Sequence, residues 1–446
     1  MDEITPMETT RATTPTNQKT VHQIPEMMSM LFTIAGGEVA TRKPSAPDMV
    51  WGLEEEQYDL LMSHYRPLVK LAKYDGCYIP MSKENDINPL IYYFRWLFIG
   101  TVVALASYQT MYMFCYIVFQ ADYSSQTALT IVELMWSFQS IMSIFFTIYW
   151  RREDYITTLF RTAHKVHNSV PQLEAKQWIY FVMKFGVALI IAVVIMSTLI
   201  ILSVIFGFSR YIMVDLRCLM AYGEKLIPLQ VVLFTYIYFS WVCCMGRFLV
   251  FTTAAYFESE HFNKQLAEVG KTDRHVGDEL LEHYIKHCQL AKVIYLLDQT
   301  FEVYVFFMLA SNIPATIFSL IAFFMNLRAS WHSALVALPS VVFCMITLLG
   351  LTVVPAKLHK SITDVVHILY DNERIWKQHD DKAYQIAQVF ITHGKQSILG
   401  ISVWGFAVVS KPLILTTVSL TISYLSFVLE LKSNFVPSAL PQNNTN

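Results

Sequence analysis

The sequence predicts an all-α protein with seven transmembrane helices, its N-terminus in the cytoplasm and its C-terminus outside the cell. Three observations lead to this prediction: the composition, the lengths of the charge-poor stretches and the distribution of basic residues. Of the 446 residues, 54% are hydrophobic and 15% are charged, whereas soluble domains carry about 25% charged residues. Such a chain is expected in a lipid bilayer, as a multi-pass protein of the cell membrane.

Seven stretches of the chain reach the length of about 20 apolar residues that a helix needs to cross the hydrocarbon core. The predicted spans, which together make a transmembrane domain over residues 95–431, are 96–120, 129–150, 185–208, 226–257, 303–327, 330–356 and 398–431. The last span is broken at Pro412, which lacks an N–H group and disfavours helix at Lys411. We expect a half-helix near 397–409 and a full helix near 413–431, with one kinked helix as the alternative.

The segments outside the spans are polar. Residues 1–50 begin with a Thr/Pro-rich run and are expected to be a disordered cytoplasmic tail without an apolar leader. Residues 51–94 form a cytoplasmic or interfacial segment, and 52–74 have the pattern of an amphipathic helix at the membrane surface. Residues 432–446 are expected to be a short extracellular tail, whose sequon at Asn443 lies too near the end for us to expect glycosylation.

The basic residues determine the predicted orientation, because Lys and Arg accumulate on the cytoplasmic side of membrane proteins. The N-terminal tail and the connections after spans two, four and six hold 26 of the 33 Lys and Arg, and the opposite face holds five. This orientation disfavours a G-protein-coupled receptor, in which the N-terminus is outside. A secondary transporter is disfavoured because we find no internal repeat. Both remain alternatives to a receptor channel.

Other classes of function receive little support from the sequence. The formal net charge of −2 gives no basic surface for nucleic acid. No phosphate loop, catalytic carboxylate pair or Ser-His-Asp arrangement stands out, so we expect neither an enzyme nor a cofactor. His283 and His287 have the i, i+4 spacing of a metal-binding pair, but without a third ligand we expect a solvated helix and no metal site.

Three charged residues lie within or beside the predicted spans, namely Glu133, Arg247 and Lys411. Charges inside a membrane are costly and are often functional. All three lie near predicted span ends, so we expect their side chains to reach the interface by snorkelling.

The C-terminal stretch WGFAVVSKPLILTTVSLTISYLSFVLEL resembles the last transmembrane helix of the insect-type gustatory and odorant receptor superfamily. The gustatory branch ends in Thr-Tyr, five hydrophobic residues and Gln-Phe. Tyr424 matches this motif and Ser423 replaces Thr, whereas Glu430 and Leu431 replace Gln and Phe. RPLVKLAKYDGCYIP at 66–80 is similar to the family's segment before the first span. With the seven spans and their orientation, the resemblance covers the whole chain, and the departures suit a divergent nematode member.

The resemblance implies a sensory receptor of the plasma membrane that is itself a stimulus-gated, non-selective cation channel in sensory neurons. In that family four subunits surround one pore lined by the last helix, and each subunit holds a ligand pocket in its outer half. A homotetramer, or a hetero-oligomer with related receptors, is therefore expected in the bilayer. The charged, helix-patterned connections 257–301 and 357–397 are suited to extend the membrane helices into the cytosol and to associate there.

The last helix carries a polar stripe, because Ser419, Ser423, Ser426 and Glu430 recur at i, i+4, i+7 and i+11. A polar stripe in a membrane must face water or protein. We predict a pore wall, and packing through small residues is the alternative. The predicted pore-lining residues are Thr417, Ser419, Thr421, Ser423, Tyr424, Ser426 and Glu430.

A stimulus pocket is predicted near the outer side, because pockets combine aromatic walls with a few polar groups. Its predicted residues are Gln109, Tyr112, Asn312, Trp331 and His332. An interfacial belt position is the alternative for Trp331. Sugars, bitter compounds, carbon dioxide, peroxide and light are all stimuli within the superfamily. Trp331, the nine Trp and the 20 Met favour the nematode branch that senses ultraviolet light and hydrogen peroxide and drives avoidance behaviour, although any aromatic membrane protein carries such residues.

Overall fold

The computed structural model describes residues 89–119, 124–152, 226–271, 274–377, 380–396 and 399–435, together with Tyr222 and single positions between 155 and 195. All of these belong to one unit of the chain, Glu56–Asn446. The predicted disordered tail, the amphipathic segment 52–74, most of the third span and Asn443 lie outside the described residues.

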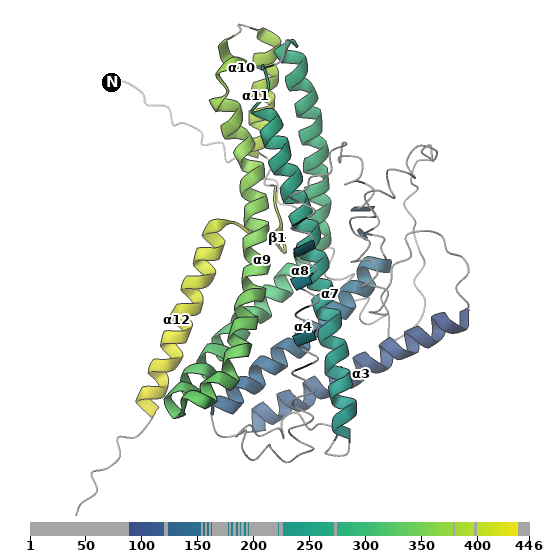
Figure 1. Cartoon of the computed structure of the whole chain (residues 1–446), viewed down its shortest axis with the longest axis vertical. Helices are drawn as coiled ribbons and strands as arrows, with labels where there is room; N and C mark the ends of the chain where they lie inside the picture. Colours follow the sequence, from purple (N-terminus) through teal and green to yellow (C-terminus); the bar gives the residue numbers. More distant parts are fainter. Residues whose placement is uncertain are drawn as a thin grey trace, which may run out of the picture. The chain divides into compact units, whose positions relative to one another are not determined.

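The described part of the chain is almost entirely helical (Figure 1). Its elements are α3 (Pro89–Phe119), α4 (Ser125–Arg152), α7 (Ile227–Leu266), α8 (Val276–Ala329), α9 (Trp331–Asp371), α10 (Glu373–Lys377), α11 (Asp381–Gln396), β1 (Ser402–Val403), β2 (Ala407–Val408) and α12 (Lys411–Phe435). Among the described residues, five helices are long and apolar enough to cross a membrane: α3, α4, α7, α8 and α9. They lie at the first, second, fourth, fifth and sixth predicted spans, and they make the chain a multi-pass membrane protein.

Helices α7, α8 and α9 are longer than a membrane crossing requires. At 54 residues, α8 is about 80 Å long, whereas the hydrocarbon core is about 30 Å thick. The charge-free part of α8 begins after Glu302, so its first 27 residues, 276–302, continue the membrane helix as a charged extension. The extensions of α8 and α9 run side by side and pack against α11 (Figure 1).

The core lies where α8 meets α4, α7 and α9. Trp150 of α4 is 1% exposed, and its indole N–H donates to the carbonyl of Thr300 at 2.9 Å. Its ring contacts Phe301 and Tyr304 of α8, with centroid separations of 4.8 and 5.5 Å. Phe248 of α7 also contacts Phe301, at a centroid separation of 5.4 Å. These four packed rings therefore hold three helices together where the charged extensions begin.

The half-helix expected near 397–409 is not present, because this stretch contains a β-hairpin instead. Strands β1 and β2 pair antiparallel, with Ser402 opposite Val408 and Val403 opposite Ala407. Trp404 and Gly405 in the turn have φ values of 50° and 70°, a left-handed conformation that ends a helix. Two glycines and a run of β-branched residues favour extended chain here over helix.

The hairpin is held against α8 immediately before the last helix. The backbone N–H of Ser402 donates to Asp298 Oδ1 at 2.6 Å, and that of Trp404 donates to the carbonyl of Glu302 at 3.3 Å. On α9, the ring nitrogen Nδ1 of His359 hydrogen-bonds the carbonyl of Leu399 at 2.7 Å. Helix α12 then begins at residue 411, so Pro412 lies in the first turn, where no N–H is needed.

We expect Gly400→Ala to destabilise the protein by about 1–3 kcal/mol, because Gly400 has a φ of +151° that Ala rarely adopts. A Cβ at this position would also lie 2.6 Å from a methyl carbon of Val408. Gly246→Ala within α7 is the matched control, since nothing lies within 4 Å of its added Cβ. Thermal unfolding in detergent checks the prediction, and equal melting temperatures for the two variants would contradict it.

Candidate functional site

A carboxylate lies inside the helix bundle. Glu133 is about two turns from the start of α4, and the hydroxyl of Tyr238 on α7 donates to its Oε2 at 2.8 Å. Among the described residues, no Lys, Arg or His forms an ion pair with Glu133. The snorkelling expected for Glu133 is therefore wrong, because its carboxylate bonds a neighbouring helix.

Tyr238, the partner of this carboxylate, belongs to a series of ring contacts between three helices. The ring of Trp136, three residues after Glu133, contacts Tyr238 edge-on with a centroid separation of 6.4 Å. It also contacts Phe343 of α9 at 5.0 Å, and Phe343 contacts Trp241 of α7 at 5.0 Å. We call Glu133, Trp136, Tyr238, Trp241 and Phe343 the aromatic cluster.

The cluster combines one acidic group with apolar walls, the composition typical of small-molecule sites. Glu133, Trp136, Tyr238 and Phe343 are each only partly buried, so packing within the chain leaves some of their surface accessible. Trp241 is 3% exposed, and its indole N–H has no hydrogen-bond partner within the described ranges. The sequence carried a signal for this site that we did not use: a lone Glu in an apolar span with Trp one turn later.

Several other polar groups inside the bundle join neighbouring helices. Gln139 Nε2 of α4 donates to Ser311 Oγ of α8 at 3.0 Å. Asn312 of α8 donates to the carbonyl of Cys344 at 3.2 Å and accepts from the hydroxyl of Thr347 at 3.0 Å, both on α9. Because buried polar groups need partners, these bonds determine how the helices meet.

Arg247 also departs from expectation. It is 3% exposed in the middle of α7, and its Nη1 donates to Thr147 Oγ1 of α4 at 3.1 Å. Snorkelling to the interface is therefore wrong for Arg247, which joins two helices in the core. Lys411, by contrast, is exposed at the first residue of α12.

The residues of the predicted stimulus pocket lie on three helices in different environments. Gln109 of α3 is 1% exposed, and Tyr112 one turn later is half-buried. Asn312 is fully buried and engages α9 through both of its amide atoms. Trp331, the first residue of α9, is 64% exposed, and the side chain of His332 lies outside the described set. The predicted pocket thus differs from the aromatic cluster, which shares none of its residues.

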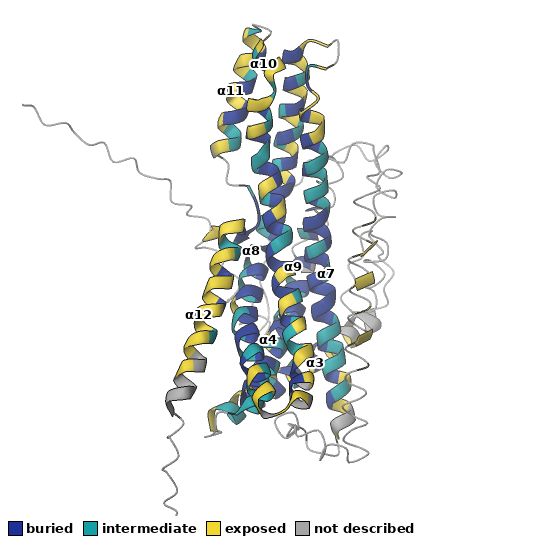
Figure 2. Cartoon of the chain, turned by 60° about the vertical axis from the view of Figure 1, so that its left-hand side comes forward, coloured by how far each residue is buried: buried dark blue, intermediate teal, exposed yellow. Residues whose placement is uncertain are grey.

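Helix α12 packs one side against α8 and α9 and leaves the rest of its surface exposed (Figure 2). Thr417 and Thr421 are 8% and 7% exposed on the packed side, where Leu425 also contacts the core. The remaining predicted pore residues are all exposed: Ser419, Ser423, Tyr424, Ser426 and Glu430. In the single chain, the helical stripe at i, i+4, i+7 and i+11 is therefore uncovered.

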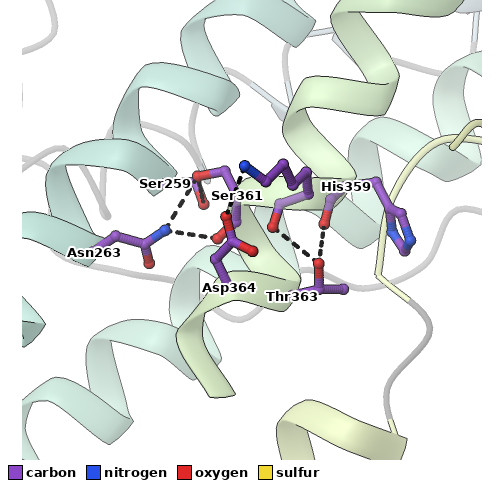
Figure 3. Close-up of polar contacts among 7 residues, drawn as sticks. Ser259, Asn263, His359, Ser361, Thr363 and Asp364 are labelled. Carbon is purple, nitrogen blue, oxygen red and sulfur yellow. Dashed lines mark hydrogen bonds and ion pairs between the residues drawn. The ribbon is translucent and has the colours of Figure 1, made fainter. Parts of the chain in front are cut away.

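The charged extensions are joined by polar contacts (Figure 3). Ser361 of α9 donates to Ser259 of α7 at 3.0 Å, and Asn263 Nδ2 of α7 donates to the carbonyl of Ser361 at 2.7 Å. At the far end, Lys382 of α11 donates to Asp278 of α8 at 2.6 Å, and this hydrogen bond raises the pKa of Lys382.

His283 and His287 lie in the extension of α8 and are not solvated. They are 8% and 1% exposed, and both rings contact Phe262 of α7. His287 also contacts Phe390 and His393 of α11. The expectation of a solvated helix is wrong because α11 folds back over this face. In the part of the chain that is described, no group of three or more His, Cys, Asp or Glu is arranged to hold a metal ion.

Comparison with known proteins places the chain in a family. The model of the family described as "Caenorhabditis protein of unknown function, DUF267" matches residues 61–417. The chain is a DUF267 protein. The match includes the whole helical bundle described above and the first turns of α12. No curated protein matches the sequence.

The fold of this DUF267 protein is that of an insect olfactory receptor. It is similar to the structure of olfactory receptor OR5 from the insect Machilis hrabei, with a TM-score of 0.65 and 12% identity over 84% of this chain and 100% of that chain. The structure of OR5 in complex with eugenol matches with a TM-score of 0.59 and 13% identity, over the same shares of the two chains. The similarity spans the full length of the receptor.

Proposed function

We propose that this DUF267 protein is a chemosensory receptor of the plasma membrane that is itself a ligand-gated, non-selective cation channel. The observation that carries the proposal is the full-length likeness to an insect olfactory receptor, at a TM-score of 0.65. The resemblance of the C-terminal stretch to the same superfamily, found in the sequence, supports it independently. In the proposal the N-terminus is cytoplasmic, and α12 and a helix in the region of residues 185–208 complete seven spans.

The proposed pore wall is the exposed polar stripe of α12, formed by Ser419, Ser423, Ser426 and Glu430. Exposed polar side chains on a membrane helix are unfavourable against lipid, and four copies of the stripe around one axis would face water instead. Thr417 and Thr421 are left out of the wall because they pack toward the chain's own helices.

The proposed stimulus site is the aromatic cluster between α4, α7 and α9. A ligand there would touch three helices at once, and α9 in turn packs against α12. Differential contact with two arrangements of these helices is what a gating ligand requires. The stimulus in this proposal is a small organic molecule, and ultraviolet light and hydrogen peroxide are alternatives for the same receptor.

Assembly is the first test. Purified in mild detergent, the protein should run as a homotetramer by mass photometry, because one copy leaves the polar stripe of α12 uncovered and exposes Tyr384 and Val389 on α11, each at 53%. A strictly monomeric particle would count against the channel.

Recording in lipid bilayers is the second test. Unitary currents are expected from the reconstituted protein, whereas a secondary transporter gives none. A receptor that signals only through a G protein would also show no unitary current. The absence of unitary currents with every stimulus of a broad panel would therefore overturn the proposal.

A further inference from the structure

The carboxylate of Glu133 lies inside the described bundle without a cationic partner there. Its one hydrogen bond is from the neutral hydroxyl of Tyr238, and no cationic side chain of the described ranges pairs with it. Removing an ionised carboxylate from water is unfavourable unless an opposite charge and further hydrogen bonds compensate. Arg247, a buried cationic residue of the same bundle, donates to Thr147 Oγ1.

The aromatic rings near Glu133 provide surfaces that attract cations. Trp136, Tyr238 and Phe343 come from three helices, and the ring of Trp136 contacts those of Tyr238 and Phe343 at centroid separations of 6.4 and 5.0 Å. The faces of aromatic rings attract cations, most strongly for Trp. As whole residues, Glu133 and the three ring residues are intermediate in exposure, whereas the neighbouring Trp241 is 3% exposed.

We propose that the aromatic cluster binds an organic ammonium ion, whose charged nitrogen pairs with Glu133 and whose apolar body lies against Trp136 and Phe343. This inference rests on the proposed function and names the chemical class of its ligand. The hydroxyl of Tyr238 donates to Oε2, which leaves Oε1 to accept a hydrogen bond from the ligand nitrogen. The cation completes the charge balance that the described chain does not supply.

The binding test compares two molecules that differ only in the charged group, 2-phenylethylamine and 2-phenylethanol. Thermal shift and calorimetry on the purified full-length protein measure their affinities without any need for channel activity. The amine should bind the wild type at least about tenfold more tightly than the alcohol. The reason is that only the amine can form a charge pair with Glu133 in a low-dielectric site.

Two variants assign that preference to the cluster. Glu133→Gln preserves an acceptor for Tyr238 and the side-chain volume, and it should abolish the preference for the amine. Phe343→Leu removes one ring and should weaken amine binding while the preference for charge persists. Glu282→Gln, on the exposed extension of α8, is the matched control and should bind as the wild type does.

The outcomes separate this inference from the proposed function. If the alcohol binds the wild type as tightly as the amine, or if Glu133→Gln retains the preference, the ammonium site is wrong even where currents are recorded. If the amine binds through Glu133 but no stimulus opens a pore, the ammonium site is supported and the proposed channel function is wrong.

Discussion

Replacement of Glu430 by Lys should lower the unitary cation conductance of the assembled channel on the order of tenfold, the scale by which charged clefts change local ion concentrations. Glu430 is exposed, one turn beyond Ser426 on the proposed pore stripe. In a four-fold assembly it appears four times around one mouth. Rings of carboxylates concentrate cations and disfavour anions.

The uncharged replacement gives the quantitative form of this prediction. Glu430→Gln should keep a working channel with lower conductance at low salt, and the difference from the wild type should shrink as salt rises. Screening is the reason, since the Debye length falls from about 10 Å at 0.1 M to about 3 Å at 1 M. Recordings over a series of salt concentrations make the measurement. Ser419→Ala, on the same stripe without a charge, is the control, and equal salt dependence in both variants would remove Glu430 from the pore mouth.

Trp150→Ala is expected to be the most destabilising single substitution proposed for this bundle, at about 3–5 kcal/mol. The change removes a fully buried ring that packs on Phe301 and Tyr304, and it leaves the carbonyl of Thr300 without its indole donor. The melting temperature in detergent measures the loss, as does the yield of folded protein.

Trp331→Ala provides the control for Trp150→Ala, because the same side chain is removed from a site that is 64% exposed. Its effect on stability should stay within about 0.5 kcal/mol. Comparable losses in the two variants would show that the packing around Trp150 does not hold α4 to α8 as described.

The parts of the fold that follow from local composition were predictable from the sequence. Length and hydropathy located α3, α4, α7, α8 and α9, because a bilayer crossing demands an apolar run of fixed length. The hairpin before α12 was not predicted, since hydropathy does not distinguish a short apolar strand pair from apolar helix. Gly400 and Gly405 were the local signals for extended chain in this stretch, because glycine disfavours helix.

The candidate site was harder to predict because it depends on contacts between distant parts of the chain. Glu133 meets Tyr238, and Trp136 meets Phe343, across sequence separations of more than a hundred residues, and no spacing within one helix indicates such contacts. The burial of His287 has the same origin, since Phe390 and His393 reach it from α11.

The hairpin between α11 and α12 has a mechanical consequence for the proposed channel. A continuous helix transmits torsion and axial force along its length, whereas a two-residue strand pair with a left-handed turn interrupts that transmission. The hydrogen bond from Ser402 to Asp298 holds the hairpin on α8. In the proposed channel we therefore expect α12 to tilt or rotate about residues 409–411 while α11 keeps its contacts, so that the subunits stay together when the pore opens.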